Sequence, residues 1–192
     1  LNGTDPVIFF ESQRLYEMEE KFHEGGVPEE YYEIPLGQPD IKRQGKDITI
    51  LTIGATLYQA IEAAKELEEK WGIQAEVIDA RSLVPFDYTL LLQSVEKTGR
   101  LLLVSDAGER GSFLNDIARN VTEQCFGTLK AAPYVMGTRN WITPSFELEK
   151  DFFPQPQWIL DAIHQRFIPL EGHVCHYDFS NGYRLQEAKK GL

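Results

Sequence analysis

The chain is organised around residues 47–87, DITILTIGATLYQAIEAAKELEEKWGIQAEVIDARSLVPFD. Residues 47–53 form a short apolar, β-branched run, which is typical of a strand. Apolar side chains then recur at helical spacing between charged ones, at Leu57, Ile61, Ala64 and Leu67. Trp71-Gly72 ends this pattern, and a second apolar run occupies residues 73–80. Strand, helix and strand within about 40 residues predict a βαβ unit with parallel strands and a right-handed crossover.

Capping residues place the ends of the predicted helices. Thr56 and Gln59 have the spacing of a capping box at the start of the first helix. Asp87 is expected to cap a second helix that ends at Gly99, and Ser112 is expected to cap a third.

Strand signals alternate with these helices along the rest of the chain. Residues 101–105 are continuously apolar, which predicts a strand buried on both faces, and residues 132–137 predict another. A short helix over residues 145–153 and a final one over residues 156–167 should follow. Residues 41–46 are expected to form a turn-bearing approach, and residues 106–111 a loop. The alternation predicts an α/β fold, a three-layer α/β/α sandwich with a mostly parallel sheet.

Composition excludes several classes of protein. The 192 residues carry a formal net charge of −11, which disfavours nucleic acid and anionic membrane as partners. No run approaches the roughly 20 apolar residues of a membrane span. Two cysteines, Cys125 and Cys175, are too few for a disulfide framework. We expect a cytoplasmic protein, or one of the mitochondrial matrix if it is eukaryotic. The absence of an initiator Met suggests a fragment.

Four segments in register resemble the transketolase-type C-terminal domain of thiamine-diphosphate-dependent 2-oxoacid dehydrogenase β subunits. They are IDARSLVPFD (78–87), SVEKTGRL (94–101), PVIFFE (6–11) and EQCF (123–126), the last resembling branched-chain members. The resemblance implies an assembly and docking domain of a branched-chain 2-oxoisovalerate dehydrogenase. Such an enzyme decarboxylates the 2-oxoacid and transfers the acyl group to the lipoyl-lysine of an acyltransferase.

The resemblance also implies a division of the chain into domains. Residues 1–33, which hold a predicted strand at 6–10 and an acidic linker at 17–33, would end the preceding pyrimidine-binding domain. Residues 34–168 would form the transketolase C-terminal-like domain. Residues 169–192 would be an extension, expected to be an extended tail that packs on a neighbour or is partly mobile.

Four residues are candidates for interface or structural roles. Arg81 follows the second strand of the βαβ unit, where α/β sheets tend to bind ligands. It could receive an anion or a partner carboxylate, but we favour an ion pair with Asp87 that fixes the strand-to-helix turn. Asp106 and Arg139 lie in DAGERGSF (106–113) and TRNWITP (138–144), which depart from the family's "EAxxTGGF" and "GxDTPxP". These departures put the family's contacts with neighbouring domains there in doubt.

Three further patterns are weighed and set aside. His173-Val174-Cys175-His176 contains zinc-ligand types, but a structural site usually needs two spaced ligand clusters and no second cluster is visible. Cys125 lies near a predicted helix end, where a buried, inert thiol is common. Residues 108–112 form a glycine-bearing loop, for which a tight turn is favoured over an anion site. The sequence therefore offers no catalytic, cofactor-binding or metal residue.

The expected whole enzyme holds thiamine diphosphate and Mg²⁺ in domains outside this chain, so the fragment alone should be inactive. Its expected partners are the decarboxylase α subunit or domain, the dihydrolipoyl acyltransferase and further copies of itself. Two alternatives remain. One is an independent small-molecule-binding or regulatory α/β domain. The other is the C-terminal domain of a transketolase or a deoxyxylulose-phosphate synthase.

Overall fold

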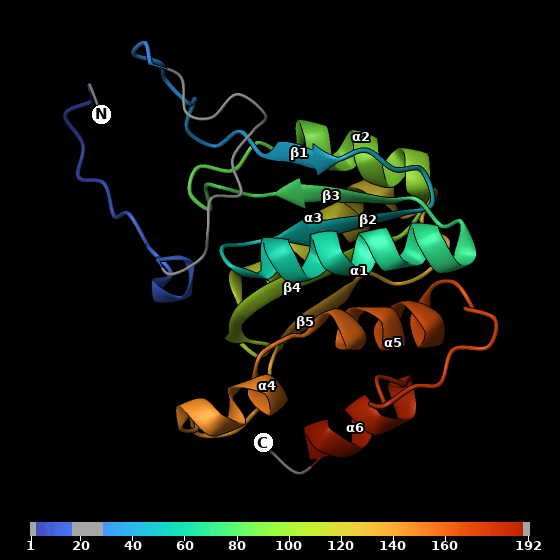
Figure 1. The fold of residues 1–192 in the computed structure, drawn as a ribbon. Coiled ribbons are helices and arrows are strands. Elements are labelled where there is room, and N and C mark those ends of the chain that lie inside the picture. Colours follow the sequence, from blue (N-terminus) through green and yellow to red (C-terminus); the bar gives the residue numbers. More distant parts are fainter. Residues whose placement is uncertain (1–2, 17–28, 190–192) are drawn as a thin grey trace. The chain divides into compact units, whose positions relative to one another are not determined.

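The computed structural model describes residues 3–16 and 29–189. The chain divides into two compact units, residues 1–34 and residues 35–192. The second unit contains a five-stranded sheet in the order β1-β3-β2-β4-β5, shown in Figure 1. The strands are β1 (Asp40–Arg43), β2 (Ile48–Thr52), β3 (Ala75–Asp79), β4 (Leu101–Gly108) and β5 (Tyr134–Thr138). Strands β2 to β5 are parallel to their neighbours and β1 is antiparallel to β3, which confirms the mostly parallel sheet.

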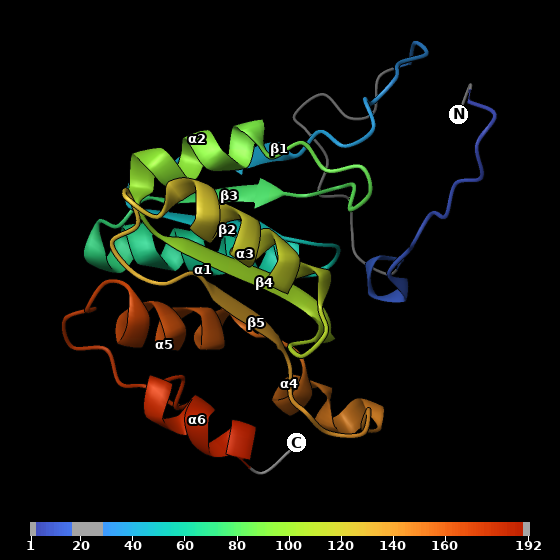
Figure 2. The same cartoon turned by 180° about the vertical axis from the view of Figure 1, so that it is seen from behind.

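Helices cover both faces of this sheet and confirm the three-layer sandwich. On one face lie α1 (Thr56–Trp71) and α5 (Pro156–Arg166), and on the other lie α2 (Thr89–Thr98) and α3 (Phe113–Cys125), as Figures 1 and 2 show. Each face has its own buried cluster, one including Leu67, Trp158 and Ile163 and the other Leu91, Ile117 and Val121. Because β2 is buried on both faces, its whole run ITILT is inaccessible.

The helix ends confirm some of the predicted caps and correct others. Gly99 ends α2 in the left-handed conformation, and the Ser112 hydroxyl accepts the Leu114 N–H at the start of α3. The N-cap position of α2 is Tyr88 and not Asp87 as expected, although the Asp87 carboxylate accepts the N–H of Thr89, the first residue of α2, at 2.9 Å. The predicted capping box is wrong, because the Thr56 hydroxyl donates to the carbonyls of Ile53 and Val104 and so ties α1 to the sheet.

One strand was not expected from the sequence, and another is longer than expected. Residues 40–43 form β1, an edge strand that pairs with β3, where only a turn-bearing approach was expected. Its charged residues are tolerated because one side of an edge strand faces solvent. Strand β4 runs on to Gly108, where a loop was expected, and pairs with Thr138 after a register shift. Gly137 permits this close approach, since an added Cβ would lie 2.5 Å from the carbonyl oxygen of Ala107.

The chain beyond α5 packs on its own domain, which corrects the expectation of an extended tail. Leu170 and Phe179 are buried in the same cluster as Trp158. Residues Asn181–Lys189 then form a further helix, α6. The shorter elements η2 (Phe146–Leu148) and α4 (Glu149–Phe152) replace the single short helix expected over residues 145–153. None of the helices within the described residues is both long and apolar enough to cross a membrane.

Residues 6–10 do not form the predicted strand. In this unit the described structure contains one short 3-10 helix, η1 (Gln13–Leu15). The side chains of Ile8, Phe9 and Phe10 are 79–85% exposed. A strand needs a neighbouring strand for its backbone hydrogen bonds, and the described residues of this unit supply none. Residues 17–28 of the expected linker lie outside the described residues.

Candidate functional site

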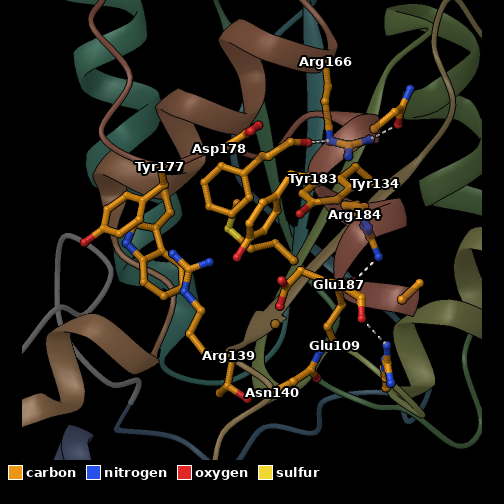
Figure 3. Close-up of a pocket in the computed structure, with 18 of the residues that line it drawn as sticks. Glu109, Tyr134, Arg139, Asn140, Arg166, Tyr177, Asp178, Tyr183, Arg184 and Glu187 are labelled. Carbon is orange, nitrogen blue, oxygen red and sulfur yellow. Dashed lines mark hydrogen bonds and ion pairs between the residues drawn. The ribbon is translucent and has the colours of Figure 1, made fainter. Parts of the chain in front are cut away.

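A hollow of about 1230 Å³ lies along the edge strand β5 and past its carboxyl end, and is the candidate site, shown in Figure 3. It is bordered by β5, by residues that follow β4 and β5, by α5, and by the chain from residue 176 through α6. Carboxyl ends of parallel strands are where open α/β sheets bind their ligands. Part of this pocket therefore lies where the fold favours binding, and the tail after α5 supplies one of its walls.

One wall of the hollow consists of aromatic rings that pack at tilted angles beneath an arginine. The ring of Trp158, on α5, lies 5.1 Å from Tyr177 and 6.2 Å from Phe179, measured between centroids. The guanidinium carbon of Arg139 lies 4.2 Å from the Trp158 centroid and 5.0 Å from that of Tyr177. This geometry is that of a cation–π contact, which leaves the edges of the guanidinium group available for hydrogen bonds.

Tyr134 lies opposite, between two further arginines. The guanidinium carbons of Arg166 and Arg184 lie 4.0 Å and 4.7 Å from its ring centroid. Only 3% of Tyr134 is exposed. Burial, with a smaller contribution from the charge of Glu109, raises the pKa of Tyr134 to about 12. The phenol therefore stays neutral across the physiological range and can donate a hydrogen bond.

The charges of the arginines are only partly balanced within the hollow. Arg184 forms an ion pair with Glu109. Arg166 donates from Nε to the Phe179 carbonyl at 2.5 Å and from Nη1 to Asn181 at 3.0 Å, while burial lowers its pKa. Among the described residues, no hydrogen-bond or carboxylate partner of the Arg139 guanidinium is found. Unpaired guanidinium donors beside aromatic faces suit a planar molecule that carries a carboxylate or phosphate.

Arg81 and Asp87, two of the residues selected from sequence, lie elsewhere. Arg81 follows β3 with a φ of 54°, and its guanidinium donates to the Gln38 carbonyl at 3.1 and 2.9 Å. Its carboxylate neighbour is Asp40, at 3.9 Å, and not Asp87 as expected. Asp87 is instead engaged with Thr89, whose side chain and N–H both hydrogen-bond to the carboxylate and lower its pKa.

The other two candidates lie at the carboxyl ends of neighbouring strands. Asp106 is in the carboxyl-terminal half of β4, and Arg139 directly follows β5. Of the four selected residues, only Arg139 lines the hollow. Sequence reasoning missed Trp158, Tyr134 and Arg166, because buried aromatic residues and helix-end arginines have ordinary structural explanations. The Arg-aromatic contacts arise only when β5, α5 and the tail meet.

A second cluster of side chains lies where the segment after α5 packs on that helix. Ligand atoms of Asp161, His173 and Cys175 lie within 4.8 Å of one another. Asp161 is fully buried and accepts hydrogen bonds from the backbone N–H groups of His176 and Tyr177, at 3.0 and 2.9 Å. Its other oxygen lies 2.7 Å from Nε2 of His173. The tertiary structure thus brings one further ligand type, the carboxylate of Asp161, beside the HVCH segment, which the sequence alone did not indicate.

Comparison with known proteins gives a family match over residues 37–159, to "Transketolase, C-terminal domain". Among curated relatives, the acetoin:2,6-dichlorophenolindophenol oxidoreductase β subunit of Bacillus subtilis is 41% identical over 84% of this chain and 46% of its own length. The Bacillus subtilis 2-oxoisovalerate dehydrogenase β subunit is 39% identical over 68% and 38%. The pyruvate dehydrogenase E1 β subunit of the same organism is 34% identical over 84% and 48%.

A solved structure described as a split-gene transketolase, inactive β4 tetramer, matches with a TM-score of 0.60 and 27% identity. It aligns with 76% of this chain and 48% of its own chain. The present chain thus spans about half or less of the length of the relatives that it matches.

Proposed function

Because the chain belongs to the transketolase C-terminal domain family, we propose that it is the assembly domain of a thiamine-diphosphate-dependent dehydrogenase β subunit. Its curated relatives are β subunits of oxidoreductases named for acetoin, pyruvate and 2-oxoisovalerate. Since the chain spans about half of such subunits, the catalytic reaction is a property of the proposed whole enzyme. The role of this domain is then to hold that enzyme together.

The observation that carries this proposal is an exposed apolar segment that follows β5. Trp141, Ile142, Phe146 and Leu148 lie within eight consecutive positions and are 58%, 94%, 83% and 52% exposed. Contiguous apolar side chains of this size on a surface mark sites of protein–protein contact. We assign this segment, which overlaps the stretch 138–144 that replaces the family's "GxDTPxP", to the contact with another subunit of the enzyme.

The exposed side chains of residues 6–10 support the same proposal. Ile8, Phe9 and Phe10 are apolar and lie almost entirely in solvent. A segment of this composition is expected to pair with strands of a sheet, and the described part of its own unit holds no strand. We propose that residues 1–33 complete the pyrimidine-binding domain that precedes this one in the whole β subunit.

The described residues do not fit the cofactor of such an enzyme. Within residues 3–16 and 29–189, one group of three or more close metal-ligand side chains is found, Asp161, His173 and Cys175. Mg²⁺ takes hard oxygen ligands, whereas this group offers a thiol and an imidazole. We therefore assign no step of thiamine chemistry to this chain and place the diphosphate and Mg²⁺ in the other domains of the proposed enzyme.

For the substrate of the whole enzyme we propose the class of 2-oxoacids, with 2-oxoisovalerate as the branched-chain candidate. The EQCF segment (123–126) and the 39% identity to the 2-oxoisovalerate subunit support that candidate. The acetoin and pyruvate subunits, at 41% and 34% identity, support acetoin and pyruvate as its competitors. Comparing kcat/KM for the three compounds on the assembled αβ enzyme decides among them.

The proposed partners are the α subunit, the dihydrolipoyl acyltransferase and other copies of the β chain. The related split-gene transketolase is described as an inactive β4 tetramer, so a β-type chain of this family does self-associate without activity. That description supports both self-association and the inactivity of the isolated chain. Its 27% identity is lower than the 34–45% shared with dehydrogenase β subunits, which favours the dehydrogenase over a transketolase.

The test replaces Ile142, the most exposed member of the apolar segment, by Asp in the full β subunit. The matched control is Phe126→Asp, since Phe126 is 78% exposed and lies at the far end of α3. Light scattering after size exclusion, with and without α subunit, measures assembly. Ile142→Asp should shift the protein to smaller species and Phe126→Asp should not. Equal assembly of both variants and the wild type would rule out this segment as the contact.

A second function, a regulatory small-molecule site, is favoured by the hollow at β5. Trp158 and Trp141 line it, so tryptophan fluorescence reports on binding there. The probe is 2-oxoisovalerate, a small organic acid. Saturable quenching that is lost in Arg139→Ala and kept in Arg119→Ala, an exposed arginine of α3, would support this function. Fluorescence that does not respond to millimolar probe would remove it.

A further inference from the structure

The segment after α5 brings a histidine and a cysteine to one side of the chain. His173 and Cys175 are two residues apart in a stretch without helix or strand, residues 173–175. Side chains at that spacing in extended chain point the same way. Asp161 lies on α5 directly against them, and the three side chains present ligand atoms within 4.8 Å of one another. Two separate parts of the chain thus contribute to one cluster.

The carboxylate of this cluster is held in place by its surroundings. Asp161 is 0% exposed. Gln157 donates to Oδ1 at 2.8 Å, and two backbone N–H groups of residues 176 and 177 donate to Oδ2. Groups that hydrogen-bond to a ligating carboxylate fix its direction, which is how metal sites are commonly supported. The cluster therefore has an outer layer of supporting contacts.

The histidine is also confined. The ring of Trp71 meets His173 edge-on, with the centroids 5.6 Å apart, and His164 lies 5.4 Å away on the same scale. Trp71 itself donates from Nε1 to the Glu171 carbonyl at 2.9 Å, which anchors the segment just before His173. The side chain of His173 is 7% exposed. Its imidazole therefore has little room to leave its place beside Asp161.

A hydrogen-bonded pair alone does not account for all three residues. The 2.7 Å contact between Asp161 and His173 explains their proximity without an ion. Cys175 is a free cysteine, and no hydrogen bond joins its thiol to another of the described residues. Its sulfur nevertheless lies beside Asp161 and His173. A thiol, an imidazole and a carboxylate within 4.8 Å of one another form a donor set of Zn²⁺.

The spacing is compatible with that ion. Zn²⁺ bonds of about 2.0–2.3 Å at tetrahedral angles separate ligand atoms by roughly 3.3–3.8 Å. Side-chain rotations that move the ligand atoms by about 1 Å would bring them from within 4.8 Å of one another to these separations. The Asp161–His173 contact would lengthen at the same time. Because Cys175 is partly exposed, solvent reaches this side of the cluster and can supply a water molecule as the fourth ligand.

We propose that Asp161, His173 and Cys175 bind one Zn²⁺ ion, which fastens the segment after α5 onto that helix. The same segment carries Tyr177 and Phe179 into the aromatic wall of the hollow at β5. Zinc binding would thus order one side of the candidate ligand site. This inference is independent of the proposed assembly role.

The experiment titrates the reduced, metal-free chain with ZnCl₂ in a calorimeter. The wild type should bind one ion in a manner that depends on both His173 and Cys175, with a Kd below about 1 μM. His173→Ala and Cys175→Ser should each weaken binding by about tenfold or more. The matched control is His176→Ala, since His176 is an exposed histidine of the same segment that lies outside the cluster. It should leave the Kd within about twofold of the wild type.

Substitution with Co²⁺ gives a second measurement that does not depend on stability. A thiolate ligand produces a charge-transfer absorption band, which should appear in the wild type and in His176→Ala and vanish in Cys175→Ser. Circular dichroism of each variant verifies that it is folded. The proposal is overturned if the wild type binds no Zn²⁺, if Cys175→Ser keeps the band, or if His176→Ala abolishes binding while His173→Ala retains it.

Discussion

The guanidinium carbon of Arg139 lies 4.2 Å from the ring centroid of Trp158, so a residue that follows β5 is stacked on a buried side chain of α5. The ring of Phe179, from the tail, lies 5.7 Å from the same guanidinium carbon. One charged group thus connects three parts of the chain that are distant in sequence. The stability of this region and the shape of the hollow should both depend on that contact.

Arg139→Ala should lower the free energy of unfolding by about 1–2 kcal/mol, because a partly desolvated cation–π contact is lost. Arg139→Lys keeps a cation over the rings and should lose about half as much. Urea denaturation followed by circular dichroism measures both. The control is Arg119→Ala, whose exposed ion pair with Glu123 should contribute less than about 1 kcal/mol. Equal losses at Arg139 and Arg119 would show that the stacking contributes nothing.

Asp161→Ala should destabilise the protein by about 3 kcal/mol or more, since it leaves buried donors without an acceptor. The donors include the N–H groups of His176 and Tyr177. Hydrogen exchange of these two amides should accelerate well before that of the sheet. Asp178→Ala, which removes an exposed acceptor of the Ser180 N–H, should leave both amides protected. Unchanged protection in Asp161→Ala would contradict the anchoring role.

Tyr134 should make the protein less stable at high pH. Its folded pKa is raised to about 12, mainly by burial, above the ordinary value of 10.0. Between these values the unfolded chain loses a proton that the folded chain keeps, so stability is full below pH 10 and falls as pH rises toward 12. The loss should approach about 2–3 kcal/mol. Tyr134→Phe should flatten this part of the stability curve, and an identical slope in both proteins would refute the assignment.

Two glycines should respond in opposite directions to substitution by alanine. In Gly137→Ala the new Cβ would meet the backbone of residues 107 and 109 at 2.5 Å, so β4 and β5 must separate locally. A loss of about 2–3 kcal/mol is expected, as for overpacking. Gly182→Ala lies within α6 with its nearest contact at 3.8 Å and should stabilise by up to about 1 kcal/mol. Thermal unfolding of both variants tests the contrast.

Local signals predicted most of the sheet and its helices. The run ITILT and the spacing of Leu57, Ala64 and Leu67 produce β2 and α1 as expected, because burial on a sheet face selects these patterns. Strand β1 was missed because it is four residues long, polar and at an edge. The capping box failed because Thr56 bonds to a carbonyl of β4, a partner 48 residues away.

The candidate site was predicted less well. Arg139 was selected because TRNWITP departs from the family pattern, and the structure places it in the hollow. Arg81 was expected to meet Asp87, but the strand order brings β1 and Asp40 beside it instead. Trp158 and Asp161 carry no local signal, because a Trp and an Asp on one helix are compatible with many roles. Their importance comes from the neighbours that surround them.

The amino-acid sequence alone determined the α/β class, the family and the positions of most elements. The spacing of apolar residues and the capping residues are local signals, because they act over one or two turns of the chain. Only the tertiary structure decided that the tail returns to α5, that Arg139 stacks on Trp158, and that Asp161 meets His173 and Cys175. These contacts join residues that are distant along the chain or lie on different elements. They depend on how the sheet, α5 and the tail are packed, and the spacing of residues in one segment does not encode that packing.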